Sequence, residues 1–140
     1  MKKRIAFMGA GAIGGYVGGQ LSRNGHDVTL IDPWPAHIEA IRANGLEMTG
    51  TTAAERCIVK PNTMHLTDAQ SLSKQKPIDI AFICMKSYDT EWATAMIRQY
   101  LAPDGFIVSL PLGRALRPPA SVSARSRRCA AGTGIVPEYR

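Results

Sequence analysis

Residues 4–19 read RIAFMGAGAIGGYVGG and contain the strongest structural signal in the chain. Residues 4–8 are a short apolar run that ends at a glycine, which is typical of a buried strand. Helical spacing of apolar residues begins at Ile13 and ends at Asn24-Gly25, a common helix stop. The stretch therefore predicts a strand, a glycine-rich turn and a helix in that order.

The turn carries the pattern G-x-G-x-x-G. Its six positions are Gly9, Ala10, Gly11, Ala12, Ile13 and Gly14. We expect Gly9 to allow the tight turn, Gly11 to let the backbone approach a pyrophosphate, and Gly14 to let the helix pack closely. Because helix N-termini attract phosphate, the pattern predicts a dinucleotide site formed by all six residues. The alternative is a glycine-rich turn that binds no ligand.

An acidic residue completes the dinucleotide-binding pattern. Residues 27–31 are predicted to form a second strand, and Asp32 follows it, 23 residues after Gly9. A carboxylate there accepts hydrogen bonds from ribose hydroxyls and repels a 2'-phosphate, so Asp32 favours NAD(H). Arg23 and Arg42, the nearest arginines in sequence, are not expected to clamp such a phosphate. The alternative for Asp32 is a helix N-cap.

The rest of the chain continues the alternation of strands and helices. The predicted elements are a helix at 36–45, short strands at 46–50 and 55–60, a polar connection at 62–77, a strand at 78–85, a helix at 89–101 and a strand at 105–110. Such alternation predicts an α/β fold of Rossmann type, with a doubly wound, mostly parallel sheet.

Side-chain spacing predicts which helix faces pack on the sheet. In the helix at 36–45 the inward residues are Ile38, Ala40 and Ile41. In the helix at 89–101 they are Trp92, Ala95, Met96 and Tyr100. Ser87 or Asp89 is expected to accept the first N–H groups of that helix.

Three stretches together carry a family resemblance: GAGAIGGYVGGQLSRNGHDVTLID, HIEAIRANGL and ICMKSYDTE. With them, residues of about 3–110 resemble the N-terminal half of the ketopantoate reductases (2-dehydropantoate 2-reductases). The resemblance implies an NADP(H)-binding Rossmann domain and hydride transfer to a 2-keto acid, in pantothenate biosynthesis. Lys86 matches the lysine that the family places beside the cofactor; the alternative is a solvated loop lysine.

The resemblance also implies what the chain lacks. In the family a second, helical domain carries the general-acid lysine and the substrate-binding residues, so no catalytic residue is expected here. The family continues after the last strand with Gln-Asn-Gly, whereas this chain has Pro111, Leu112 and Gly113. We expect a truncated chain that is close to inactive alone. A rival interpretation is a non-catalytic dinucleotide-binding module.

Charge divides the chain into a domain at 1–110 and a tail at 111–140. The domain has 11 Lys and Arg against 10 Asp and Glu, whereas the tail has 6 Arg against Glu138. The Arg/Pro-rich tail is predicted to be disordered. Three origins remain open for it: a frameshift or premature stop that replaced the native continuation, a native basic arm, or a C-terminal segment without a role. Nucleic acid is not an expected partner, because Tyr139 is the tail's only aromatic residue. An apolar face left bare by the absent domain predicts self-association.

Cysteines and hydropathy give the remaining expectations. Cys57, Cys84 and Cys129 form no C-x-x-C pair and have no histidine at metal-ligand spacing, so no metal site is expected. Reduced thiols predict a cytoplasmic protein. The N-terminus begins like a secretory signal, but its centre is glycine where a signal needs leucine. No apolar run approaches the roughly 18 residues of a membrane span.

Overall fold

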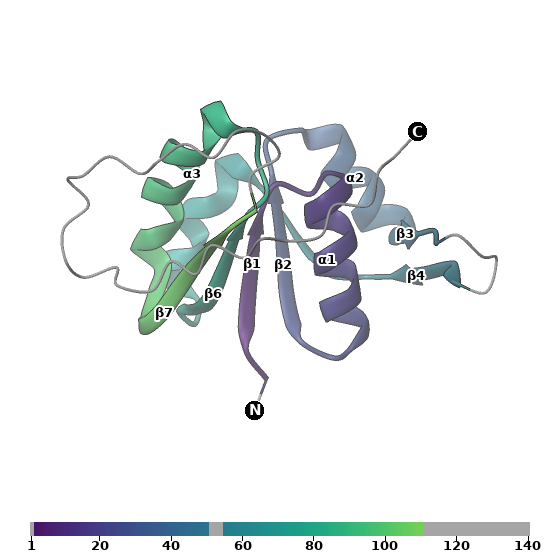
Figure 1. Cartoon of the computed structure of the whole chain (residues 1–140), viewed down its shortest axis with the longest axis horizontal. Coiled ribbons are helices and arrows are strands. Elements are labelled where there is room, and N and C mark those ends of the chain that lie inside the picture. Colours follow the sequence, from purple (N-terminus) through teal and green to yellow (C-terminus); the bar gives the residue numbers. More distant parts are fainter. Residues whose placement is uncertain (1, 51–54, 111–140) are drawn as a thin grey trace.

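The computed structural model describes residues 2–50 and 55–110, and the predicted tail at 111–140 lies outside these ranges. A five-stranded sheet forms the centre of the molecule (Figure 1). Its strands are β1 (Arg4–Met8), β2 (Asp27–Asp32), β5 (Asn62–His65), β6 (Ile78–Ile83) and β7 (Leu101–Ser109). All neighbours pair in parallel, in the order β5-β2-β1-β6-β7. The predicted α/β fold of Rossmann type is confirmed.

Helical segments connect the strands and cover both faces of the sheet. They are α1 (Ala12–Arg23), α2 (Pro35–Asn44), η2 (Leu66–Lys74), η3 (Ser87–Asp89), α3 (Thr90–Ile97) and η4 (Arg98–Tyr100). The chain adds strands first to one side of β1 and then to the other, so the order reverses between β1 and β6. In open parallel sheets ligands bind at such a reversal, outside the carboxyl ends of the strands.

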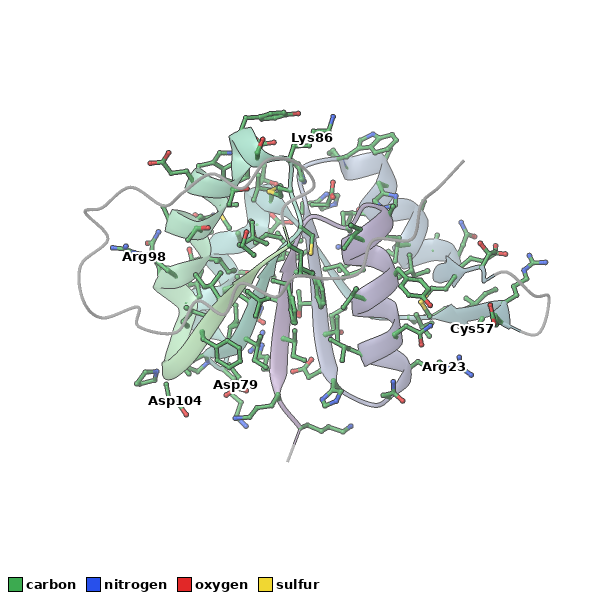
Figure 2. The ribbon with its side chains drawn as sticks, viewed as in Figure 1. Arg23, Cys57, Asp79, Lys86, Arg98 and Asp104 are labelled. Carbon is green, nitrogen blue, oxygen red and sulfur yellow. The ribbon has the colours of Figure 1, made fainter. Side chains whose placement is uncertain are left out.

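The two ends of the sheet are chemically distinct, and we call them the carboxyl edge and the amino edge. Figure 2 shows Lys86, which follows β6, at the carboxyl edge, with Asp79 and Asp104 at the opposite, amino edge. The carboxyl edge also receives the turn from β1 into α1 and the end of β2. The fold thus brings the predicted glycine turn, Asp32 and Lys86 to one edge.

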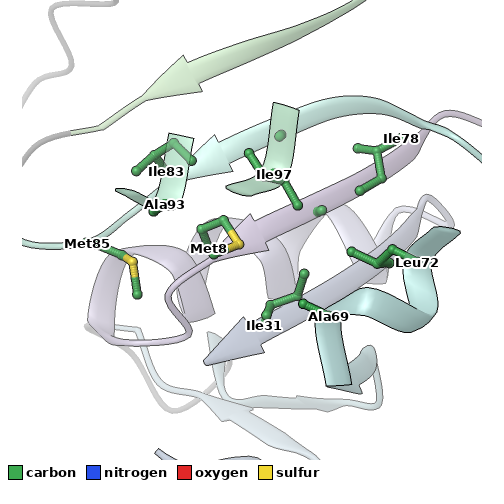
Figure 3. Close-up of a cluster of buried hydrophobic side chains, with 11 residues drawn as sticks. Met8, Ile31, Ala69, Leu72, Ile78, Ile83, Met85, Ala93 and Ile97 are labelled. Carbon is green, nitrogen blue, oxygen red and sulfur yellow. The ribbon is translucent and has the colours of Figure 1, made fainter. Parts of the chain in front are cut away.

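The core has two layers, one on each face of the sheet. Along β1 the side chains alternate, with Ile5 and Phe7 in one layer and Ala6 and Met8 in the other. The first layer packs under α1 and α2, and Phe7 stacks on Phe82 with ring centroids 4.6 Å apart. The second layer packs under η2 and α3 (Figure 3). Its labelled residues are Met8, Ile31, Ala69, Leu72, Ile78, Ile83, Met85, Ala93 and Ile97.

A small separate sheet lies beside α1. It pairs β3 (Leu46–Met48) with β4 (Cys57–Val59) in antiparallel fashion, which confirms the two short strands predicted there. Met48 is buried, and Arg56, directly before β4, forms an ion pair with Glu47 of β3 at an N–O distance of 2.5 Å. No helix in the described ranges has both the length and the apolarity needed to cross a membrane.

The structure corrects the prediction for residues 62–77. The expected polar connection contains the edge strand β5 and the 3-10 helix η2. The strand escapes sequence reasoning because its residues, Asn-Thr-Met-His, do not alternate, and it is held by pairing with β2 on one side. The last strand is also longer than expected: β7 begins at Leu101, whereas the sequence predicts a start at residue 105.

The predicted inward face of the last helix is rotated. Ala93 and Ile97 are buried, whereas Trp92 is 38% exposed and Ala95 lies at the surface. Met96 and Tyr100 pack against the core as expected. The helix itself is shorter than predicted, ending at residue 97 and continuing as η4.

In α2 the prediction is correct for Ile38 and Ile41 and wrong for Ala40, which is exposed. Alanine is a weak marker of burial, because the transfer of its small side chain from water to the core changes the free energy of folding only slightly.

Candidate functional site

The glycine turn begins with a residue that the backbone geometry restricts to glycine. Gly9 has φ +102°, and its N–H donates to the Ile31 carbonyl at 2.8 Å. A Cβ added there would lie 2.7 Å from the Cys84 carbonyl oxygen. Both the torsion and the close approach exclude a side chain, so the tight-turn role predicted for Gly9 is confirmed.

The other two glycines of the pattern differ in their surroundings. A Cβ on Gly14 would overlap the Gly9 carbonyl oxygen and lie 3.1 Å from Cys84 Cβ, so the first turn of α1 packs directly on the loop. This confirms the close packing predicted for Gly14. Gly11 is exposed, and a Cβ there would have nothing within 4 Å. The backbone at Gly11 is therefore open to a ligand.

The start of α1 has the properties of an anion site. Gly11 is the N-cap, no side-chain hydrogen bond caps the helix, and the first turn holds no acidic residue. The Gly11 carbonyl already accepts the Gly15 N–H at 2.7 Å. Ala12 and Ile13 complete the loop within this first turn, where backbone N–H groups lack intrahelical acceptors. The positive end of the helix dipole and free N–H groups suit a phosphate.

Asp32 binds the backbone on both sides of the site. Its Oδ2 accepts the Ala10 N–H at 2.8 Å, and its Oδ1 accepts the Trp34 N–H at 2.9 Å. The N-cap of α2 is Trp34, without a side-chain cap bond, so the N-cap alternative for Asp32 is wrong. A carboxylate has about four acceptor positions. Asp32 thus ties the glycine loop to the turn after β2 and still has acceptor capacity.

Two aromatic residues beside Asp32 were not predicted. The His37 Nε2 lies 2.7 Å from the Ala10 carbonyl oxygen, so this nitrogen carries the proton and donates. The Trp34 ring stacks on His37 with centroids 5.7 Å apart and an interplanar angle of 23°. The only sequence signal was the Asp-Pro-Trp-Pro stretch, which places a tryptophan directly after the strand-end acid.

Lys86 and Cys84 lie on the other side of the glycine loop, after β6. Lys86 is exposed at the carboxyl edge, and no described residue pairs with its ammonium group (Figure 2). Its carbonyl accepts the Asp89 N–H at 2.9 Å. Cys84 lies against the loop, and burial raises the pKa of its thiol to about 12. The raised pKa disfavours the thiolate, which is the reactive form of a cysteine.

The arginines nearest to Asp32 in sequence are engaged elsewhere. Arg42 donates from Nη1 to Glu39 at 2.8 Å, and from Nε and Nη2 to the Thr63 hydroxyl and carbonyl at 3.3 Å each. The Nη1 of Arg23, at the end of α1, lies 4.0 Å from the Cys57 sulfur. In Figure 2 Arg23 lies far from Lys86, which marks the carboxyl edge. Neither guanidinium lies free beside Asp32, as predicted.

Two smaller expectations concern the same edge. Asp89 is the N-cap of α3 but makes no side-chain cap bond; its Oδ1 accepts the Trp92 Nε1–H at 2.9 Å. The side-chain cap bond expected from Ser87 or Asp89 is therefore wrong, although Asp89 does occupy the N-cap position. Within residues 2–50 and 55–110, no three metal-ligating side chains lie close enough together to hold a metal ion.

The fold and the glycine turn define a Rossmann-type α/β domain with the loop of dinucleotide-binding proteins. The sequence profile described as "Ketopantoate reductase PanE/ApbA" matches residues 5–121. The chain belongs to this ketopantoate reductase family.

Individual relatives and solved structures show how far the similarity extends. A 2-dehydropantoate 2-reductase of Pyrococcus horikoshii is 39% identical over 110 residues, which are 79% of this chain and 33% of the relative. The structure of a ketopantoate reductase from Ralstonia eutropha JMP134 aligns with TM-score 0.64 and 36% identity, over 77% of this chain and 34% of that one. A D-mandelate dehydrogenase bound to NADH and anilino(oxo)acetate aligns with TM-score 0.66 and 25% identity, over 80% and 34%. The chain thus spans about a third of these proteins.

Proposed function

We propose that this chain binds NAD(H) at the carboxyl edge and is the cofactor-binding portion of a reductase that acts on a 2-keto acid. The observation that carries the proposal is the uncapped start of α1, where Gly11 is open and Asp32 holds the neighbouring Ala10 N–H. The loop is fixed from one side and free on the other, as a pyrophosphate site needs. The exposed position of Lys86 at the same edge supports a contact of its ammonium group with the cofactor ribose or with a substrate carboxylate.

The choice between the two nicotinamide cofactors follows from charge. A 2'-phosphate near Asp32 would meet a carboxylate, and within the described ranges Arg42 is already bonded to Glu39 and Thr63. The Asp32 carboxylate and the engagement of Arg42 with other partners support NADH binding at least as well as NADPH.

Fluorescence titration with NADH and NADPH tests this choice. We expect NADH to bind at least as tightly as NADPH, and Asp32→Asn to shift the ratio of the two dissociation constants toward NADPH. The matched control is Asp27→Asn, at the amino end of the same strand, which should leave the ratio unchanged. NADPH binding tighter by about tenfold or more in the wild-type chain would refute the preference.

The reaction is inferred from relatives that bear the name 2-dehydropantoate 2-reductase. Hydride transfer to a keto group needs a group that stabilises or protonates the oxygen receiving the charge. We infer that residues 1–140 alone bind the cofactor but oxidise NADH slowly in the presence of ketopantoate. Absorbance at the NADH band measures this turnover, and a rate typical of enzymes would overturn the inference.

A further inference from the structure

Trp34 is held in an exposed position beside the proposed cofactor site. It is 65% exposed, although burying an aromatic ring would stabilise the fold. Its N–H is fixed by Asp32, and Pro33 and Pro35 on either side restrict the backbone. The indole is therefore attached to a stiff segment while most of its surface meets solvent.

The second ring connects this tryptophan to the glycine loop. His37 stacks on the indole, and its Nε2–H donates to the Ala10 carbonyl at 2.7 Å. Asp32 holds the N–H of the same Ala10 residue. The ring pair, the acid and the loop thus form one hydrogen-bonded unit, in which the orientation of the rings is fixed relative to the phosphate-binding turn.

We propose that Trp34 and His37 form a stacking platform for the purine ring of the dinucleotide. This inference rests on the proposed function and extends it to a specificity for adenine nucleotides. The platform lies directly after Asp32, on the ribose side of the loop, so a base attached to that ribose is within reach of the indole. Because the rings are already fixed, stacking costs little conformational entropy.

The test uses tryptophan fluorescence in the full chain. The sequence has two tryptophans, so Trp92→Phe leaves Trp34 as the only one. ADP-ribose, which has the adenine half without nicotinamide, should quench the Trp34 emission. Reduced nicotinamide mononucleotide, which lacks adenine, serves as the opposite probe and should bind without touching the platform.

Substitution then measures the contribution of the platform. Trp34→Leu should weaken NADH and ADP-ribose alike by about tenfold, the usual range for loss of base stacking, and leave the mononucleotide affinity unchanged. Trp34→Phe keeps a ring and should recover most of the affinity. Because Trp34 is exposed, thermal melting of both variants should match that of the parent chain.

The outcomes separate this proposal from the proposed function. Equal NADH affinity in the parent and Trp34→Leu overturns the platform and leaves the cofactor site intact. An equal loss for ADP-ribose and the mononucleotide also overturns it, because the substitution would then act through the loop. If the parent chain binds neither NADH nor ADP-ribose, the proposed function and the platform both fail.

Discussion

Gly14→Ala should destabilise the domain through a contact that the backbone cannot relieve. The added Cβ would overlap the Gly9 carbonyl oxygen, closer than the 3.0 Å that real Cβ atoms keep, and lie 3.1 Å from Cys84 Cβ. Overpacking costs roughly 1–3 kcal/mol, and a backbone neighbour places this case at the upper end. The gain in helix propensity of about 1 kcal/mol offsets part of it. The net loss in the free energy of unfolding is about 2 kcal/mol.

A loss of this size is easily measured. For a domain of this size about 1 kcal/mol lowers Tm by roughly 4–8 °C, so thermal unfolding followed by circular dichroism should shift by about 8–16 °C. Gly11→Ala is the matched control within the same loop. Its Cβ meets nothing within 4 Å and its φ is −73°, so only the poorer N-capping by alanine, worth about 1 kcal/mol or less, should lower Tm, by clearly less than in Gly14→Ala. NADH affinity should nevertheless fall by about tenfold or more, because the methyl group occupies the space for the pyrophosphate.

The reasoning fails if Gly14→Ala has the same Tm as the parent chain, since the packing of α1 on the loop would then not be tight. It also fails if Gly11→Ala keeps both its stability and its full NADH affinity. In that case the open backbone at the start of α1 would have no part in binding.

Three further predictions concern single side chains of the carboxyl edge. Asp32→Ala leaves the buried Ala10 N–H without its acceptor, so urea unfolding should show a loss of about 2 kcal/mol, and an unchanged midpoint would contradict the bonding described. Lys86→Met should weaken NADH binding by about fivefold without changing Tm; Lys76→Met, before the amino end of β6, is its control, and an equal effect of both would exclude a local role. Burial raises the folded pKa of Cys84 to about 12 from 9.0, so its contribution to stability is complete below pH 9 and is lost as pH rises toward 12. Alkaline urea titration of the parent and Cys84→Ala should therefore converge above pH 9, and parallel curves would argue against the shift.

The elements that could be predicted from the sequence are those with local causes. The glycine turn follows from torsions and close contacts within a few residues, and Gly9 has the positive φ that the turn requires. The helix end at residues 24–25 was predicted from an Asn-Gly pair, and the same pair stands at residues 44–45. Gly25 and Gly45 have φ +85° and +84°, values that favour glycine.

The elements that were missed depend on partners distant in sequence. The polar strand β5 forms because it pairs in parallel with residues 29–32 of β2, which lie 33 residues earlier in the chain. The rotated face of α3 arises because Trp92 donates to Asp89 at the surface, a bond that hydrophobic spacing cannot reveal. His37 meets Ala10 across 27 residues, so its place in the site becomes visible only in three dimensions.

Asp32 shows why affinity alone is a poor measure of its role. The carboxylate holds the Ala10 and Trp34 N–H groups, and through them both the glycine loop and the stacking platform. A substitution that removes these bonds should loosen the whole edge and lower the affinity for NADH and NADPH alike. The ribose contact acts differently, because a 2'-phosphate meets the negative charge of Asp32 only in NADPH. The ratio of NADH to NADPH affinities therefore reports the charge, whereas the absolute affinity reports the loop, and Asp32→Asn must be judged by the ratio.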